Sequence, residues 1–392
     1  MNRHFGGDDF PTGRLLEDLA AHLVRREHAV SVLASADRRE GEARGVAVEV
    51  STAWGVRSGS KLWNWIIFWA QTCVRVPFRR WDVLVLMTDP PFMVLAAMLS
   101  RFWGGKRRVV LWTMDLYPEC LAAHGMIRPR SIAYRSLRAL NNLAFRSVDT
   151  VICLDAGQHR RLLEYSSLRR SEIHVEIVRP WDLRIFPSVD REQNRFLREH
   201  GLSEFKLALY AGNLGKAHSF TELLEGAREL HARGHREWRI VFVVQGAQRP
   251  ALMKAAHDLT NVLVLDYHPA DWVADLLWAA DVHLITLQDG WEGIAVPSKL
   301  YAALQTGAPS LFIGPAECGT AQEITRRKLG DVLPPRSDGQ LVAHTLLKLA
   351  DRGRGGRAPQ SREEVLRVGD SIVGVRHVDQ VALIQSVAQR SD

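Results

Sequence analysis

Short apolar runs alternate with amphipathic helical segments along the whole chain, and this alternation limits the possible folds more than any other feature. Four runs rich in branched residues fall in the first half, at Val30–Ala34, Asp82–Met87, Arg108–Thr113 and Thr150–Leu154. Five more follow, at Leu207–Ala211, Arg239–Gln245, Val262–Asp266, Val282–Leu287 and Ser310–Gly314. Such runs between helical segments are typical of strands in parallel sheets, with helices as the crossover connections. The pattern predicts an α/β protein with two doubly wound domains.

The chain also has the length of a two-domain protein, because 392 residues exceed what a single core usually serves. A stretch with two prolines and little periodicity, residues 179–193, separates the two sets of strands. We therefore expect a first domain at residues 1–180, a linker at 181–205 and a second domain at 206–372. We also expect a final helix at residues 373–392.

The start of the chain is unusual for this architecture. Met1 is followed at once by the polar, glycine-rich sequence NRHFGGDDFPTG, so no apolar strand precedes the first helical segment. A start codon placed too late, a truncated chain and a sheet that tolerates the loss all remain open. The segment also lacks the apolar stretch of a signal peptide. Four widely spaced cysteines without metal-type spacing lead us to expect reduced thiols in a cytoplasmic protein: Cys73, Cys120, Cys153 and Cys318.

The chain is basic, with a formal charge of +7 and a pI of about 9.4. This charge suggests an acidic partner, such as a phosphorylated substrate or an anionic lipid surface. A general preference for arginine is the alternative. The basic residues are scattered and no nucleic-acid-binding motif accompanies them, so we expect no nucleic-acid partner.

The stretch from Ala279 to Gly314 contains the strongest functional signal. It consists of a strand at Val282–Leu287, a polar loop with Glu292 and Gly293, a helix from Pro297 and a second strand. The loop therefore follows the carboxyl end of a strand, which is where open α/β sheets bind ligands. Because a helix start favours phosphate, the loop suggests a site for a sugar joined to a diphosphate.

Four segments in order resemble glycosyltransferase family four, whose members are retaining enzymes of GT-B fold. The likeness is greatest to the bacterial branch that builds cell-surface and exported polysaccharides. The segments are GRLLEDLAAHLVRREHAVSVLAS, DLYPE at Asp115–Glu119, YAGNLGKAHSF at Tyr210–Phe220 and EGIAVPSKLYAALQTGAPSLFIG from Glu292. The resemblance implies a final helix that crosses back to the first domain.

The resemblance implies that Glu292 binds hydroxyls of the donor sugar. It assigns the rest of the loop and the helix start to donor binding as well: Gly293, Ile294, Ala295, Val296, Ser298 and Lys299. The family's second glutamate is absent, since Leu300 stands eight residues after Glu292 and the nearby alternative is Ala302. Lys299 of the PSK sequence then offers a cation near the diphosphate. A solvated loop glutamate is the alternative for Glu292.

The GNLGK turn supplies the other side of the implied donor site. Its candidates are Gly212, Asn213, Gly215, Lys216 and His218. The family places a basic pair here, and a cation such as Lys216 would offset charge as the diphosphate leaves. Asn213 replaces a common arginine, and His218 stands where a lysine is usual. An ordinary surface lysine and an incidental histidine are the alternatives.

The first domain carries the implied acceptor side. Asp115 follows an apolar strand and could orient or deprotonate the acceptor hydroxyl; capping of the next helix is the alternative for Asp115 and Glu119. Gly6, Gly7 and Gly13 correspond to a loop whose bare backbone approaches the diphosphate and the acceptor. Gly13 as a simple helix start remains open.

The segment Lys61–Trp81 combines aromatic residues with arginines. The aromatics are Trp63, Trp65, Phe68 and Trp69, and the arginines are Arg75, Arg79 and Arg80. One interpretation is a helix in the interface of an anionic membrane, which would suit a lipid-linked acceptor at the inner face. The other is a helix packed on the first sheet, and the two can hold for different faces. Its apolar core is too short to span a bilayer.

The resemblance thus implies a hexosyl-type glycosyltransferase with Glu292, Asp115 and Lys216 in catalytic roles. It would move a sugar from a nucleotide diphosphate sugar to a lipid-linked glycan in surface polysaccharide synthesis. We expect no metal and no cofactor, because no metal cluster or DxD-type carboxylate pair follows a strand. A sugar-nucleotide epimerase of the same fold and a catalytically silent GT-B subunit remain as alternatives.

Overall fold

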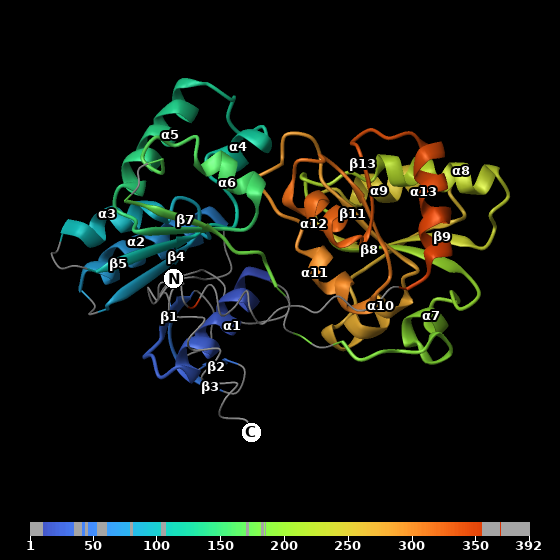
Figure 1. Cartoon of the computed structure of the whole chain (residues 1–392), viewed down its shortest axis with the longest axis horizontal. Helices are drawn as coiled ribbons and strands as arrows, with labels where there is room; N and C mark the ends of the chain where they lie inside the picture. Colours follow the sequence, from blue (N-terminus) through green and yellow to red (C-terminus); the bar gives the residue numbers. More distant parts are fainter. Residues whose placement is uncertain are drawn as a thin grey trace.

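The computed structural model describes residues 11–34, 41–43, 46–52, 61–78, 81–102, 107–169, 172–181, 184, 186–354 and 369, which form two α/β domains (Figure 1). The predicted fold class is confirmed. The first domain contains α1 (Pro11–Arg25), β1 (Ser31–Ala34), β2 (Gly41–Ala43), β3 (Val46–Thr52), α2 (Lys61–Phe78), β4 (Val83–Met87), α3 (Val94–Phe102), β5 (Arg108–Trp112), α4 (Glu119–Ala123), α5 (Ile132–Phe145), β6 (Thr150–Cys153), α6 (Ala156–Leu162) and β7 (His174–Ile177).

The strands of the first domain form two ladders in the described part of the chain. One has the order β1-β3-β2, and the other has four parallel strands in the order β4-β5-β6-β7. Our expectation that β1 shares one sheet with β4, β5 and β6 was therefore wrong. In a doubly wound sheet the opening strand stands between the second and fourth strands and joins the two parts of the sheet. No described strand precedes α1, so the described strands lack this connection.

Helix α1 joins the two ladders through side-chain packing. Leu15 and Leu19 on its buried face belong to one apolar cluster with Val32 of β1 and with Met87 and Trp112 of the other ladder. Helical spacing of these leucines explains why one face of α1 is buried. The core of the first domain is thus continuous even where its strand ladders are not.

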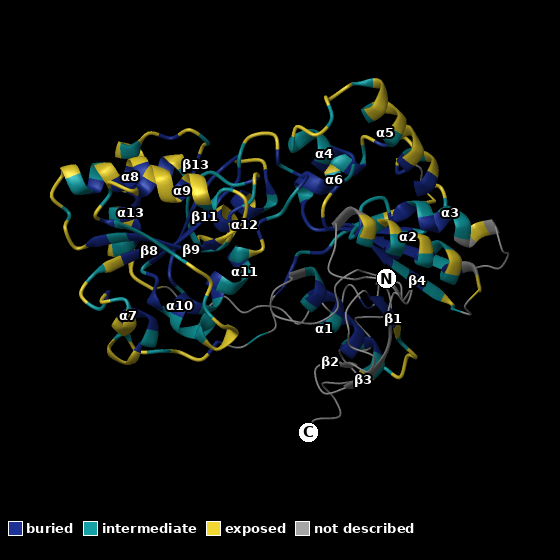
Figure 2. Cartoon of the chain, turned by 180° about the vertical axis from the view of Figure 1, so that it is seen from behind, coloured by how far each residue is buried: buried dark blue, intermediate teal, exposed yellow. Residues whose placement is uncertain are grey.

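The second domain is a single six-stranded parallel sheet with the order β10-β9-β8-β11-β12-β13. Its elements are η1 (Arg191–Gln193), α7 (Arg195–Glu199), β8 (Lys206–Asn213), α8 (Thr221–Ala232), β9 (Trp238–Gln245), α9 (Arg249–Ala256), β10 (Val262–Leu265), η2 (Ala270–Trp272), α10 (Val273–Ala279), β11 (Val282–Thr286), α11 (Lys299–Ala303), η3 (Leu304–Thr306), β12 (Ser310–Ile313), α12 (Gly319–Arg327), β13 (Gly330–Leu333) and α13 (Gly339–Arg352). The five predicted strands are confirmed, and β13 was not predicted. Figure 2 shows buried strands beneath helices whose outer faces are exposed.

The switch point of the second sheet lies between β8 and β11, where the direction of the strand order reverses. In doubly wound sheets the crevice for ligands opens at the carboxyl ends of the strands beside this point. The turn after β8 and the β11–α11 loop, residues 287–298, both leave the sheet there. The fold therefore brings together the two segments that the sequence analysis assigned to the donor.

The boundary of the linker needs a correction. Phe196 and Leu197 of α7 lie in the predicted linker, yet both are fully buried in a core cluster with Leu207 of β8. Asn194 begins this helix by accepting a hydrogen bond from the backbone N–H of Leu197 at 3.0 Å. Residues 194–202 are therefore part of the second domain. The predicted final helix at 373–392 lies outside the described residues.

Helices α4 and α6 of the first domain contact the second domain. Figure 1 shows them on the side of the first domain that faces α12. Cys120 of α4 belongs to a core cluster with Trp291 and Ile294 of the β11–α11 loop. The backbone N–H of Leu116 also donates to the carbonyl of Ile294 at 3.4 Å. The loop that follows β11 is thus packed between the two domains.

Candidate functional site

The GNLGK turn and the β11–α11 loop are tied together by hydrogen bonds. The backbone N–H of Gln288 donates to the carbonyl of Ala217 at 2.8 Å, and its side-chain amide donates to that of His218 at 2.8 Å. The amide of Gln248 also donates to the carbonyls of Gly215 and His218, both at 2.6 Å. These bonds hold the two predicted donor segments in one fixed surface.

Lys299 lies at the centre of this surface. Its ammonium donates to the hydroxyl of Tyr210 at 2.6 Å and to the carbonyl of Asn213 at 3.2 Å. Burial lowers the pKa of Lys299 to about 7, because a low-dielectric surrounding disfavours the charged form. Gly212 has a φ of +134°, and a Cβ there would stand 2.5 Å from Cε of Lys299. The lysine therefore needs a glycine beneath its side chain.

His218 does not provide the second cation that the resemblance suggested. Its Nδ1 lies 2.6 Å from the carbonyl oxygen of Thr286. Burial first, and then the nearby Lys299, lower the pKa of His218 to about 3. The ring is therefore neutral at physiological pH, and its Nδ1–H donates to Thr286. Lys299 supplies the positive charge at this point instead.

Lys216 is exposed and reaches the first domain. Its ammonium donates to the carbonyl of His124, at the end of α4, at 3.3 Å. The ring of His124 in turn packs edge-on against Trp291 of the β11–α11 loop, with 4.9 Å between the ring centroids. Asn213 is exposed beside the same turn. Lys216 thus lies where the two domains meet.

Glu292 has two carboxylate oxygens in different situations. Oε1 accepts a hydrogen bond from Nη2 of Arg161 at 3.2 Å. Oε2 is buried and has no hydrogen-bond partner among the described residues. Because a buried carboxylate oxygen without a partner is costly, the arrangement points to a missing hydrogen-bond donor at this position.

Arg161 is the main site residue that sequence reasoning missed. It lies on α6 of the first domain, and its Nε also donates to the main-chain carbonyl of Glu292 at 3.1 Å. The two residues are 131 positions apart in the sequence. No local pattern marks such a contact, since the only signal is a basic run at His159, Arg160 and Arg161.

The rest of the β11–α11 loop is held by its backbone. Gly293 has a φ of +69°, and a Cβ there would lie 2.4 Å from the carbonyl oxygen of Gly157 in α6. Ile294 is buried, whereas Ala295 and Val296 are partly buried and Ser298 is exposed. Helix α11 follows with five residues, Lys299–Ala303. The fully buried Leu300 cannot replace the missing second glutamate at a ligand.

Asp115 stands at the carboxyl end of β5 and is accessible to solvent. Neighbouring groups displace part of the water around its carboxylate, and this desolvation, followed by the charge of Asp89, raises the pKa of Asp115 to about 6. It lines a cavity of about 20 Å³, enough for one water molecule, together with Thr88 and Asn141. The helix-capping alternative is wrong, since Pro118 occupies the cap position of α4.

Glu119 faces the interior of the first domain instead of the site. It is buried, and its Oε1 accepts from the hydroxyl of Tyr165 at 2.8 Å. The guanidinium of Arg138 lies 3.6 Å from the same oxygen. Gly13 belongs to the first turn of α1, so its predicted place in a ligand loop was wrong and the helix-start alternative holds. Gly6 and Gly7 lie outside the described residues.

Helix α2 confirms the packing interpretation of its aromatic segment, and contact with a membrane stays a prediction. Phe68 and Val76 are fully buried on one face, so the helix packs on the first sheet. Trp63 and Phe78 on another face are 64% and 71% exposed. The described residues contain no helix long and apolar enough to cross a bilayer. The four cysteines are all free thiols.

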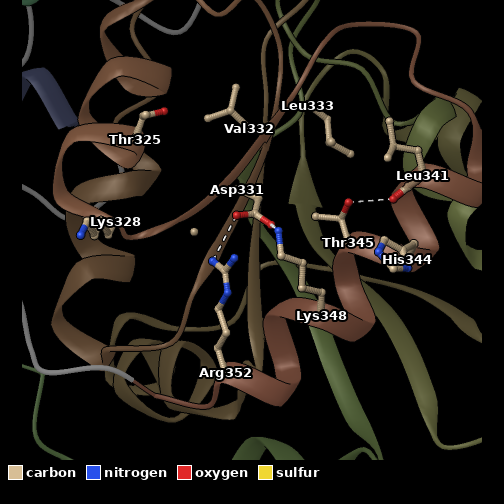
Figure 3. Close-up of a pocket in the computed structure, with 11 residues that line it drawn as sticks. Thr325, Lys328, Asp331, Val332, Leu333, Leu341, His344, Thr345, Lys348 and Arg352 are labelled. Atoms are coloured by element: carbon tan, nitrogen blue, oxygen red, sulfur yellow. Dashed lines mark hydrogen bonds and ion pairs between the residues drawn. The ribbon is translucent and has the colours of Figure 1, made fainter.

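A separate hollow lies at the β13 edge of the second sheet. It has a volume of about 650 Å³ between β13, α12 and α13. Figure 3 shows that Asp331 in this hollow is bound by Lys348 and Arg352, at 2.7 and 3.1 Å. The predicted donor residues lie outside this hollow, so we place the site at the switch point. No group of three potential metal ligands occurs in the described part.

Comparison with known proteins points to glycosyltransferases. Residues 12–176 match the model of a glycosyl transferase 4-like domain. WbjE of Pseudomonas aeruginosa, described as a probable glycosyltransferase, is 26% identical over 262 residues, which span 66% of this chain and 63% of WbjE. Residues 12–176 of the chain therefore resemble a glycosyl transferase 4-like domain.

Solved structures of GT-B glycosyltransferases share the fold of this chain. WaaG, a glycosyltransferase involved in lipopolysaccharide biosynthesis, aligns over 95% of this chain and 98% of its own, with a TM-score of 0.64 and 18% identity. HepE of Anabaena, solved with UDP and glucose, aligns over 95% and 97% with a TM-score of 0.59 and 15% identity. The match to WbjE spans less than two thirds of that protein's length.

Proposed function

We propose that the protein is a glycosyltransferase that moves a sugar from a nucleotide diphosphate sugar to a hydroxyl of a glycan acceptor. The observation that carries this proposal is the placement of Glu292 in the β11–α11 loop and of Lys299 at the start of α11. The loop presents a buried carboxylate oxygen without a partner among the described residues, and Lys299 presents an ammonium beside a glycine turn. A sugar hydroxyl and a diphosphate are the two groups that such a pair would bind.

The diphosphate would lie between Lys299 and Lys216. An ammonium binds phosphate oxygens as a point charge, and its attraction is stronger where the surroundings are dry. Both lysines would stabilise the negative charge that develops on the leaving diphosphate. We therefore propose a reaction that uses these cations and needs no metal ion.

The donor sugar would contact Glu292, whose Oε2 can accept a hydrogen bond from a hydroxyl. The acceptor oxygen then forms the new bond to the anomeric carbon, while the bond from that carbon to the phosphate oxygen breaks. Asp115 is our candidate for the group that takes the hydroxyl proton. With a pKa of about 6 it is mostly ionised at pH 7 and basic enough to accept a proton.

The acceptor class is proposed from helix α2 and from the relatives. The exposed face of α2 presents a row of apolar residues at helical spacing: Trp63, Ile66, Ala70, Val74 and Phe78. Such a face suits a helix that lies in a membrane interface beside anionic lipid. WaaG is involved in lipopolysaccharide biosynthesis. We propose a lipid-linked glycan acceptor, a role in surface polysaccharide synthesis and retention of the anomeric configuration.

A thermal-shift screen tests the proposal. UDP-glucose, UDP-N-acetylglucosamine, GDP-mannose and dTDP-rhamnose would each be added to the purified protein and to Glu292→Gln. A ligand at one hundred times its dissociation constant should add about 2.7 kcal/mol of stability. We expect one nucleotide sugar to stabilise the wild type more than the variant. Stabilisation by none of them would refute the proposal.

Product analysis separates a transferase from an epimerase of the same fold. A transferase releases nucleoside diphosphate in proportion to the glycan acceptor supplied, whereas an epimerase converts the nucleotide sugar without any acceptor. We expect acceptor-dependent release. Conversion of the bound nucleotide sugar in the absence of acceptor would favour the epimerase instead.

A further inference from the structure

Arg161 is the only described side chain recorded as hydrogen-bonded to the carboxylate that we assign to the donor sugar. Its guanidinium makes two contacts to Glu292, one to Oε1 at 3.2 Å and one to the main-chain carbonyl at 3.1 Å. Both groups are partly buried, with side-chain exposures of 29% and 32%. A planar guanidinium that binds at two points fixes the direction of its partner as well as its distance.

The rest of α6 holds Arg161 in place against the second domain. Asp155 begins this helix by accepting from the backbone N–H of Gln158 at 2.7 Å. Its other oxygen accepts from the backbone N–H of Gly319, at the start of α12, at 3.0 Å. One buried carboxylate therefore both starts the helix that carries Arg161 and attaches it to the second domain.

A close contact between two glycines completes this attachment. A Cβ on Gly157 would lie 3.2 Å from the backbone nitrogen of Gly293, and a Cβ on Gly293 would lie 2.4 Å from the oxygen of Gly157. Side chains at either position would push α6 away from the β11–α11 loop. The distance between Arg161 and Glu292 thus depends on direct backbone contact between the domains.

We propose that Arg161 is a positioning residue of the donor site, which holds Oε1 of Glu292 so that Oε2 faces the donor sugar. This inference rests on the proposed function and deepens it. Glu292 belongs to the second domain and Arg161 to the first, so the sugar subsite is complete only when α6 contacts the β11–α11 loop. Sugar binding and this domain contact therefore stabilise each other, since coupling between two equilibria is reciprocal.

The chain offers a matched control for this role. Arg160, the preceding residue, donates from its guanidinium to the carbonyl of Glu317 in the second domain at 2.9 Å. Arg160→Gln removes a hydrogen bond between the domains and leaves Glu292 untouched. Arg161→Gln removes the contact to Glu292, and Arg161→Lys keeps the charge while losing the two-point geometry.

The experiment is calorimetric titration with a nucleotide sugar and with its nucleoside diphosphate. Four nucleotide sugars are each compared with their own nucleoside diphosphate: UDP-glucose and UDP-N-acetylglucosamine with UDP, GDP-mannose with GDP, and dTDP-rhamnose with dTDP. The pair that binds the wild type best is then used for the variants. Arg161→Gln should raise the dissociation constant of the nucleotide sugar about tenfold, as for loss of a charged hydrogen bond. Binding of the nucleoside diphosphate should be unchanged, Arg161→Lys should lie between, and Arg160→Gln should match the wild type.

A double-mutant cycle with Glu292→Gln tests whether Arg161 acts through this carboxylate. In the Glu292→Gln background, Arg161→Gln should have no further effect on sugar binding. Equal losses for Arg160→Gln and Arg161→Gln, or equal losses for the sugar and the diphosphate, would overturn the positioning role while leaving the transferase proposal intact. Tighter sugar binding in Arg161→Gln would also overturn it, because Arg161 would then compete with the sugar. Failure of every probe to bind the wild type would refute the transferase proposal itself.

Discussion

Two charged residues at the carboxyl end of β11 define the candidate donor site, Glu292 in the β11–α11 loop and Lys299 at the start of α11. Glu292 and Lys299 stand seven positions apart, and neither is a freely solvated surface group. The carboxylate has one oxygen engaged by Arg161 and one without a partner. The ammonium is enclosed by Tyr210 and the backbone of Asn213. Each can therefore be tested by a change that keeps the shape of the side chain.

Glu292→Gln should reduce sugar transfer by about 2 kcal/mol or more of transition-state stabilisation, which is roughly thirtyfold or greater. The neutral amide fits the same space but loses the charge that strengthens a hydrogen bond from a sugar hydroxyl. Steady-state kinetics with the nucleotide sugar identified by thermal shift measures this loss. Asp289→Asn serves as the control, since Asp289 lies in the same loop with 56% of its side chain exposed. Unchanged turnover in Glu292→Gln would remove this residue from the site.

Binding of the nucleotide sugar should weaken as the pH rises above about 7. Burial lowers the pKa of Lys299 to about 7, so below this pH the ammonium is already present to bind the diphosphate. Above it, binding must take up a proton, and affinity should fall by up to about tenfold per pH unit. His218 does not interfere, because burial and Lys299 lower its pKa to about 3.

Lys299→Arg is the matched variant for this pH dependence. Arginine stays charged throughout this range, so the variant should bind with an affinity that changes little between pH 6 and pH 9. Calorimetric titration across this range measures both proteins. A pH profile of the same slope in Lys299→Arg would show that another group is responsible.

At the scale of elements, helix α2 has two apolar faces with different roles. Phe68 and Val76 lie in the core of the first domain, while Trp63 and Phe78 are mostly exposed. A helix that is apolar on its outer face is typical of an interface with lipid or another partner. Substitutions on the outer face can therefore change membrane binding without changing the stability of the fold.

Trp63→Ser combined with Phe78→Ser should abolish binding to anionic vesicles without lowering the melting temperature. Vesicle binding of the wild type should fade with salt, because the attraction of nearby arginines is screened over roughly 10 Å at about 0.1 M. Phe68→Ala should instead lower the free energy of unfolding by about 3 kcal/mol or more, because it leaves a cavity in the core. Co-sedimentation and thermal melts measure the two effects. Wild-type protein that ignores anionic vesicles would refute the membrane proposal.

A comparison of the predicted and observed elements shows which of them the sequence patterns can predict. Period and composition predicted every strand of the second sheet except β13, whose sequence GDVL is short and carries a charge. The loop between β11 and α11 was predicted well because all its signals lie within one short stretch. The separate ladders of the first domain were not, since strand pairing depends on residues far apart in the chain.

At the scale of the whole molecule, the site is assembled by contact between the domains. The glutamate and the lysines come from the second domain, and Arg161 comes from the first. These contacts are separated by 131 and 92 positions, so single-sequence reasoning could not find them. For the same reason the sequence analysis placed Glu119 at the site. The hydroxyl of Tyr165, 46 positions away, instead binds Glu119 inside the first domain.

Gly293→Ala should weaken nucleotide sugar binding through the contact between the domains. The new Cβ would stand 2.4 Å from the carbonyl of Gly157, so the β11–α11 loop has to move away from α6. Gly290→Ala is the control in the same loop, because its φ of +82° imposes similar backbone strain with no atom within 4 Å of the new Cβ. Both variants should lose about 1 kcal/mol of stability from strain. Only Gly293→Ala should lose sugar affinity in titration, and equal affinity losses would contradict the interdomain assembly of the site.

A crystal structure of the protein with the nucleotide sugar that stabilises it best would show whether the β11–α11 loop and the GNLGK turn form the donor site. We expect the diphosphate against Lys299 and Lys216, and a sugar hydroxyl within hydrogen-bond distance of Oε2 of Glu292. A nucleotide sugar bound elsewhere, such as in the hollow beside Asp331 and β13, would contradict it.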